Sequence, residues 1–185
     1  ITKGNEFSIR ANGCTSDLND LQITLDANHI LDIKYKNHKQ NRYRIDFTIT
    51  MPQLIAVSLS GAAKGTISGF GGQNTVIRTI LSGASVCTVA GTGINASLDI
   101  SGASKLVISG TTESLYGSVS GASQLEAYNV AATEVDIDVS GSSKAYVRPL
   151  EIFFAAASGN SRIYYKGNPV TKHFETSGNG QIIQE

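Results

Sequence analysis

A Ser-Gly pair recurs along the chain at nearly constant spacing, and this repeat limits the possible folds more than any other feature. Successive pairs are 18 to 22 residues apart, and the next two positions are mostly small, as in Ala103-Ser104 and Ala122-Ser123. The seven pairs begin at Ser60, Ser82, Ser101, Ser120, Ser140, Ser158 and Ser177. A fixed period of this length indicates structural repeats that stack on one another.

Apolar and polar residues alternate on both sides of each Ser-Gly pair. Before Ser140, for example, the apolar residues Val135, Ile137 and Val139 enclose two aspartates. A period of two is typical of a strand with one buried face. One type of turn at one phase of every repeat stacks equivalent strands in parallel, whereas an antiparallel sandwich needs alternating hairpin turns. We therefore predict an all-β fold, a parallel β-helix (β-solenoid) of about seven coils.

The composition of the Ser-Gly corner suits a tight bend better than it suits chemistry. Glycine tolerates the positive φ of a sharp turn, small side chains let the corners stack, and serine hydroxyls can bond along the stack. A catalytic serine would occur once, beside a base, but this serine occurs seven times with no histidine in phase. The corner is therefore interpreted as scaffold.

The chain has 185 residues, which suits a single β-solenoid domain. Residues 1–52 lack the corner and are predicted to form a β-rich N-terminal cap, with a hairpin turn at Lys36–Arg42, and residues 53–185 form the repeat coils. The inward positions become polar near the C-terminal end, at Lys172, Thr176 and Gln184. This is expected for a terminal coil that is open to solvent or to another copy of the chain, so a homo-oligomer is possible.

Charge and cysteine content narrow the function classes. Lys+Arg and Asp+Glu number 15 each, so no net charge favours nucleic acid or an anionic membrane. No apolar run is long enough to span a bilayer. Because the sequence starts at Ile1 instead of Met, a leader is expected to have been removed, by processing or by cloning. Cys14 and Cys87 lack metal-ligand spacing. Each is predicted to be a buried free thiol, with a disulfide as the alternative, and neither a metal nor a cofactor is predicted.

Several segments resemble those of one known family. They are the opening strand Phe7–Ile9, the segments Tyr43–Leu54, Ser158–Pro169 and Ser177–Gly180, and the repeated corners. Together they resemble the family of "putative auto-transporter adhesin, head GIN domain" proteins, common in Bacteroidetes, over nearly the whole chain. The resemblance implies a right-handed parallel β-helix that is exported to the periplasm, the outer membrane or the cell surface. It supplies no catalytic or binding residues.

The outward positions of the strands after the corners form the most suggestive surface. The strands that follow the corners at Ser120, Ser140 and Ser158 are expected to bring three tyrosines close to four cations. The predicted ligand-binding residues are Tyr128, Lys144, Tyr146, Arg148, Arg162, Tyr164 and Lys166. Aromatic faces beside cationic donors stack on sugar rings and bind acidic groups, so a surface glycan or a protein is the expected ligand. Alternatively, these tyrosines only stabilise the sheet.

Two other functions are compatible with a β-helix. Asp136 and Asp138 lie two apart on one strand, and Asp99 falls in the column of Asp138, so a carbohydrate-active enzyme could use them. Isolated surface aspartates are common, and the prediction is a protein that is not an enzyme. A structural element that assembles through its terminal coil is the third possibility.

Overall fold

The computed structural model describes residues 1–37, 41–91 and 93–185, and it gives side chains for all of these except 73–76. These residues form two compact units, one of residues 1–3 with 52–185 and one of residues 4–51. Strands make up almost all of the regular structure, and the helix in the described part, α1 (Thr15–Leu18), is a single turn. The predicted all-β solenoid is confirmed.

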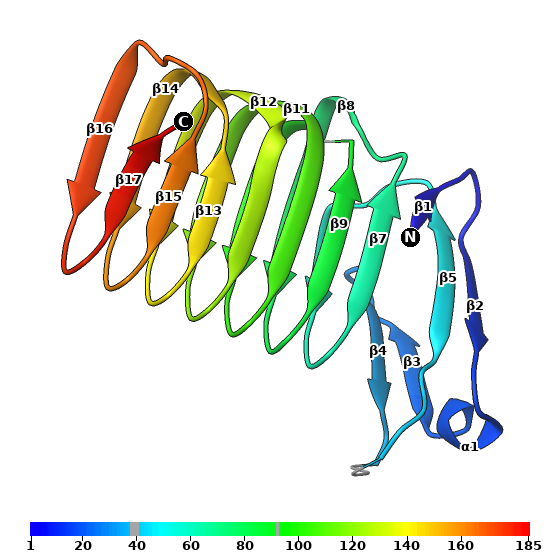
Figure 1. Ribbon diagram of the computed structural model, residues 1–185. Coiled ribbons are helices and arrows are strands. Elements are labelled where there is room, and N and C mark those ends of the chain that lie inside the picture. Colours follow the sequence, from blue (N-terminus) through cyan, green and yellow to red (C-terminus); the bar gives the residue numbers. More distant parts are fainter. Residues whose placement is uncertain (38–40, 92) are drawn as a thin grey trace. The chain divides into compact units, whose positions relative to one another are not determined.

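The larger unit is a solenoid in which the two arms of each coil stack into two parallel ladders (Figure 1). The strands that follow the corners form the post-corner ladder: β7 (Lys64–Ser68), β9 (Val86–Ala90), β11 (Lys105–Val119), β12 (Gln124–Val139), β13 (Lys144–Val147), β15 (Arg162–Tyr165) and β17 (Gln181–Gln184). The strands that precede the corners form the pre-corner ladder: β6 (Ala56–Leu59), β8 (Gly72–Leu81), β10 (Gly93–Ile100), β14 (Pro149–Ala157) and β16 (Thr171–Thr176). β11 and β12 run through both ladders, and β1 (Thr2–Lys3) pairs with β7.

The interior consists of apolar columns at the alternating positions that the sequence predicts. In the post-corner ladder, Leu106 pairs with Leu125, and both are 0% exposed. In the pre-corner ladder, Val119 pairs with Val139, and they are 0% and 1% exposed. Because the register decides which side chains face inward, it also decides the outward columns on which a ligand site must lie.

The corners are stacked glycine turns. All seven corner glycines have a positive φ, between 64° and 77°. At Gly121, an added Cβ would lie only 2.5 Å from the carbonyl oxygen of Gly102 in the preceding coil. That oxygen accepts a hydrogen bond from the backbone N–H of Ala122 at 2.7 Å. The close stacking of coils therefore depends on the absence of a side chain at the corner.

The last corner residue is a serine in five of the seven corners, and these five serines form a buried column. The Ser104 N–H donates to Oγ of Ser123 at 3.3 Å, and that hydroxyl donates to the carbonyl oxygen of Gly102 at 3.2 Å. Ser123 and Ser143 are 2% and 0% exposed. Serine hydroxyls thus bond along the stack, and the scaffold uses them.

The smaller unit consists of two antiparallel strand pairs. β2 (Ser8–Asn12) pairs with β5 (Asp46–Met51), and β3 (Leu21–Leu25) pairs with β4 (Leu31–Tyr35). The hairpin predicted at Lys36–Arg42 is therefore wrong, because the strands that flank this segment pair with other strands, although its residues 38–40 lie outside the described residues. That this unit caps the solenoid stays a prediction.

The two cysteines are free thiols in different environments. Cys87 is 0% exposed on β9, as predicted, and burial raises the pKa of its thiol to about 11. The prediction of burial is wrong for Cys14, which is exposed. Alternation was misleading there because the chain leaves β2 at Asn12 and enters α1, whose N-cap residue is Cys14.

Candidate functional site

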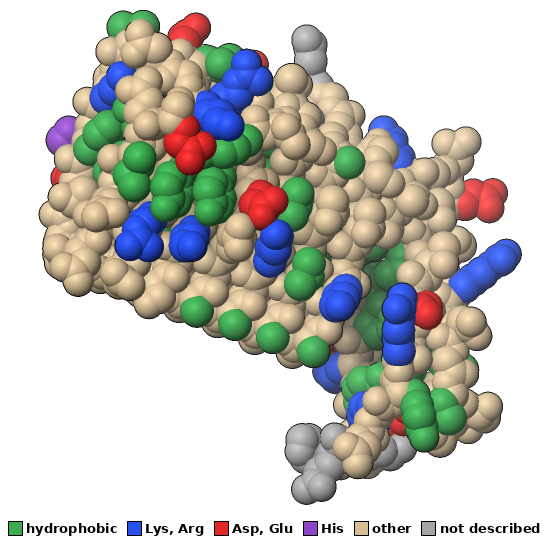
Figure 2. Space-filling model, in the orientation of Figure 1, with side chains coloured by type: hydrophobic (Ala, Val, Ile, Leu, Met, Phe, Trp, Pro, Cys, Tyr) green, Lys and Arg blue, Asp and Glu red, His purple; other side chains and the backbone are tan. Residues whose placement is uncertain are grey.

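The post-corner ladder places most of the predicted site residues side by side in outward columns. Lys144 pairs with Arg162, and Tyr146 pairs with Tyr164. In the next outward column, Lys166 lies one coil after Arg148, because the backbone N–H of Lys166 donates to the carbonyl oxygen of Val147 at 3.0 Å. We call the seven predicted residues the tyrosine–cation patch: Tyr128, Lys144, Tyr146, Arg148, Arg162, Tyr164 and Lys166. On this face, Figure 2 shows a group of green hydrophobic side chains with blue Lys and Arg side chains next to it.

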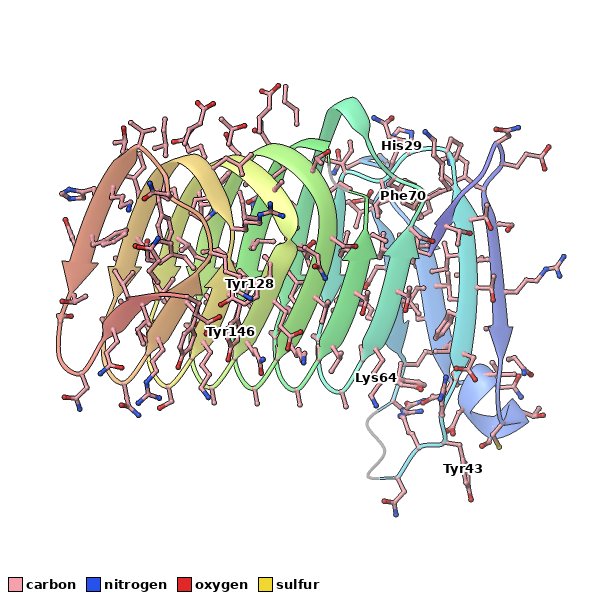
Figure 3. All side chains as sticks on the ribbon, turned by 45° about the horizontal axis from the view of Figure 1, so that its top comes forward. His29, Tyr43, Lys64, Phe70, Tyr128 and Tyr146 are labelled. Atoms are coloured by element: carbon pink, nitrogen blue, oxygen red, sulfur yellow. The ribbon has the colours of Figure 1, made fainter. Side chains whose placement is uncertain are left out.

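Ring contacts hold the three tyrosines together. The rings of Tyr146 and Tyr164 are almost parallel, at 9°, with centroids 5.0 Å apart. Tyr128 meets Tyr146 edge-on, at 80° and 5.4 Å, and Figure 3 shows these two residues close together. The faces that Tyr146 and Tyr164 turn toward each other are not open to a sugar ring. A ligand would meet ring edges, outer faces and hydroxyls, and neither the Tyr146 nor the Tyr164 hydroxyl has a hydrogen-bond partner among the described residues.

Tyr128 reaches the patch from a bulge in β12. Val107 of β11 pairs with Glu126, but Ser109 pairs with Asn129, so β12 has one residue more than its neighbour between these positions. Such a bulge bends a strand and redirects a side chain. Equal counting from the corners predicts one column for Ser109, Tyr128 and Arg148, whereas the structure gives the place beside Ser109 to Asn129.

The Tyr128 side chain is fixed by two charged neighbours. Its hydroxyl donates to Oε2 of Glu185 at 2.8 Å, and Nζ of Lys166 lies 4.4 Å from its ring centroid. Burial first, and then the hydrogen bond to Glu185, raise the pKa of Tyr128. Burial, together with the neighbouring Tyr164 and Glu126, also raises the pKa of Tyr146. Both hydroxyls therefore remain protonated donors at neutral pH.

Two carboxylates that sequence reasoning left out of the site lie beside the patch, and one of them, Glu185, forms an ion pair with a patch cation. Glu126 lies 2.7 Å from Nζ of Lys105, and Glu185 lies 3.9 Å from Nζ of Lys166. The column positions could have identified both, because Glu126 is two coils before Tyr164 and Glu185 is one coil after Lys166. Lys144 and Arg148, by contrast, have no ion-pair partner in the described part of the chain. Nε of Arg162 donates to Oε1 of Gln181 at 3.1 Å.

The carboxylates considered for catalysis lie on the pre-corner face. Asp136 and Asp138 line a shallow groove together with Asp99, Arg78 and Tyr116. Both aspartates are exposed. In a catalytic pair, burial normally raises the pKa of the general acid above that of its partner carboxylate. Over residues 1–37, 41–91 and 93–185, no group of three or more His, Cys, Asp or Glu side chains is arranged to hold a metal ion.

The last coil closes the interior with polar contacts of its own. Oε1 of Gln184 accepts a hydrogen bond from the Tyr165 hydroxyl at 3.1 Å, and its Nε2 donates to the Gly167 carbonyl at 2.7 Å. Lys172, in an inward column of β16, donates to Oδ1 of Asn168 at 3.2 Å. An inward charge on an end strand discourages pairing with a strand of another molecule. Association between copies stays a prediction.

These features define a parallel β-solenoid whose corners are scaffold and whose outward columns are open to a ligand. The chain belongs to the family described as putative auto-transporter adhesin, head GIN domain, which matches residues 1–169. No helix among the described residues is long and apolar enough to cross a bilayer. No curated protein matched the chain.

Three crystal structures show the same fold across 100% of this chain. A putative adhesin from Bacteroides fragilis has a TM-score of 0.87, 21% identity and 86% of its own chain covered. A putative adhesin from Parabacteroides distasonis has a TM-score of 0.74, 17% identity and 87% coverage. A putative lipid binding protein from the same organism has a TM-score of 0.66, 16% identity and 87% coverage. At these identities the likeness concerns the fold alone.

Proposed function

We propose that this chain is a non-catalytic, exported module that binds a surface glycan or a protein through the tyrosine–cation patch. The observation that carries the proposal is the Tyr146–Tyr164 pair beside Lys144 and Arg162. Membership of an adhesin family supports binding in preference to catalysis, and it supports an exported location.

The scaffold itself does not require these residue types. The column that contains Tyr146 and Tyr164 contains Thr66, Thr88 and Val107 in earlier coils, and those coils have the same parallel register. Small β-formers therefore suffice for the ladder. A concentration of tyrosines and cations in the fourth to sixth coils supports recognition, since exposed aromatic and cationic groups are the usual anchors of binding surfaces.

A glycan array and pull-downs from cell-envelope extracts, run with the wild type and two variants, test the proposal. Tyr146→Ala/Tyr164→Ala should weaken binding of the identified ligand at least tenfold, because central aromatic residues usually dominate binding energy. Tyr116→Ala is the matched control, since this tyrosine is 41% exposed on the pre-corner face. Equal binding by the wild type and the double variant would overturn the proposed site, and the lack of any ligand for the wild type would overturn the proposed function.

Release of product from a bound polysaccharide separates binding from catalysis. The proposal expects none. Product release that is lost in Asp138→Asn would instead favour the carbohydrate-active enzyme.

A further inference from the structure

One outward column of the post-corner ladder contains cations in four of its seven coils and no carboxylate. Pairing along the ladder gives its members in order as Lys64, Val86, Lys105, Gln124, Lys144, Arg162 and Gln181. Figure 2 shows a row of blue side chains that runs across this face, and Figure 3 labels Lys64 in the first coil. We call Lys64, Lys105, Lys144 and Arg162 the basic row.

The solenoid fixes the spacing of the basic row. Coils repeat at about 4.8 Å, so Lys64, Lys105 and Lys144 follow one another at intervals of about 10 Å, and Arg162 lies about 5 Å beyond Lys144. The row spans about 24 Å in a straight line on a sheet whose strands are paired on both sides. A straight, rigid row of charges with a two-coil period matches a linear polymer better than it matches a small molecule.

Charges are segregated between the two faces even though the chain has no net charge. The outward charged residues of the post-corner face are the cations Lys64, Lys105, Lys144, Arg148, Arg162 and Lys166 and the carboxylates Glu126 and Glu185. Those of the pre-corner face are the carboxylates Asp99, Glu134, Asp136, Asp138 and Glu175 and the cation Arg78. The post-corner face is therefore positive and the pre-corner face is negative.

We propose that the basic row binds a linear acidic polysaccharide along the solenoid axis, in particular one with an anionic group on alternate sugars. This inference rests on the proposed function, because it names the ligand class of the same face. A sugar in an extended chain advances the chain by about as much as one coil, so anions on alternate sugars meet Lys64, Lys105 and Lys144 in turn. Glu126 competes for Lys105, but both side chains of this pair are about 40% exposed, and exposed pairs are weak enough to exchange partners.

Other polyanions fit the face less well. Single-stranded nucleic acid is held by successive bases that stack on aromatic faces. Tyr146 and Tyr164 leave only their outer faces open, and their column has no aromatic residue in its first four coils. An acidic peptide that adds a strand needs an open sheet edge, and β9 to β15 each have neighbours on both sides in this ladder. The Tyr146 and Tyr164 hydroxyls next to the row supply further donors for sugar oxygens.

Isothermal titration at low salt, with hyaluronan oligosaccharides as the probe, tests the inference. These oligosaccharides have one carboxylate on every second sugar. Each of Lys64→Gln, Lys105→Gln and Lys144→Gln should weaken binding about fivefold, which is the upper range for one exposed ion pair. Arg78→Gln on the pre-corner face is the matched control and should change binding less than twofold. Raising the salt to physiological strength should weaken hyaluronan binding by the wild type, because salt screens exposed ion pairs. The difference in affinity between the wild type and the triple variant Lys64→Gln/Lys105→Gln/Lys144→Gln should then become smaller.

The outcomes separate this inference from the proposed function. If the wild type and the triple lysine variant bind hyaluronan equally, the basic row is not the binding site and the inference is overturned. The proposed function is then decided separately, by the Tyr146→Ala/Tyr164→Ala experiment. Binding of neutral dextran as tight as that of hyaluronan also overturns it. Binding of poly(dT) that is tighter than that of hyaluronan, with the same lysine dependence, overturns the choice of polysaccharide.

Discussion

Replacing a corner glycine by alanine should show how much the solenoid depends on the close approach of its coils. We compare Gly121→Ala with Gly61→Ala. The two glycines have similar φ values, 77° and 70°, so a side chain has a similar intrinsic cost at both. An added Cβ at Gly121 lies 2.5 Å from the Gly102 oxygen, whereas no described atom lies within 4 Å of one at Gly61. The pair therefore separates backbone strain from coil stacking.

The expected magnitudes follow from these distances. Both variants incur the left-handed backbone cost, about 1–2 kcal/mol. Gly121→Ala must also push two coils apart locally by nearly 1 Å to restore an ordinary contact, which weakens the 2.7 Å hydrogen bond between Ala122 N–H and the Gly102 oxygen. Loss of one buried hydrogen bond costs about 1–3 kcal/mol, so we expect a total of about 2–5 kcal/mol for Gly121→Ala.

Urea denaturation followed by far-ultraviolet circular dichroism measures both losses of unfolding free energy. In thermal melts, the same losses correspond to a lower Tm by about 2–8 °C for Gly61→Ala and about 4–20 °C for Gly121→Ala, for a chain of this size. Equal destabilisation of the two variants would refute the reasoning, because it would mean that the contact with the preceding coil has no energetic weight. Unchanged stability of both would refute the left-handed cost as well.

Three further predictions concern the interior and the last coil. Ser123→Ala should lower the unfolding free energy by about 1–3 kcal/mol, because it leaves the buried N–H of Ser104 unpaired. Ser120→Ala should lower it by less than half as much in the same urea titration, because the Ser120 hydroxyl makes only a 3.5 Å contact. The pKa of Cys87 is raised from 9.0 to about 11, so the unfolded state loses this proton first. The unfolding free energy should therefore decrease as the pH rises from about 9 to about 11. In Cys87→Ala, the part of this decrease that comes from the thiol should be absent. Lys172→Val removes an inward charge from β16 and should produce concentration-dependent association in light scattering, whereas a monomer at every concentration would contradict the edge-protection argument.

The repeat explains why so much of the solenoid could be predicted from the sequence. Each corner marks the phase of its coil, and counting from it identifies inward and outward positions without knowledge of tertiary structure. Lys144 lies beside Arg162, and Tyr146 beside Tyr164, because both pairs are at equal distances from their corners. Counting fails where a coil contains an extra residue, as in β12, where the bulge moves Tyr128 out of its expected column.

Residues 4–51 show what is lost when no repeat is present. Their strands were predictable from alternation, but the partners were not, because alternation carries no information about pairing. Lys36–Arg42 looked like a hairpin turn, yet the strands on either side pair with β3 and β2. Ring orientation was equally hidden: the sequence placed Tyr146 beside Tyr164, but only the structure shows that their rings lie face to face.

Net charge is a poor guide to the partners of a solenoid. The balance of 15 cations and 15 carboxylates argued against nucleic acid and an anionic membrane as partners. A ligand on a flat face, however, responds to charges within about one Debye length, roughly 8 Å at physiological salt. The pre-corner carboxylates face away from that ligand, and the solenoid interior separates them from it. Outward columns can change charge without disturbing the inward columns, since successive side chains on a strand point to opposite faces. A neutral composition is therefore compatible with one strongly basic face, and the relevant sequence quantity is the charge of each column counted from the corner.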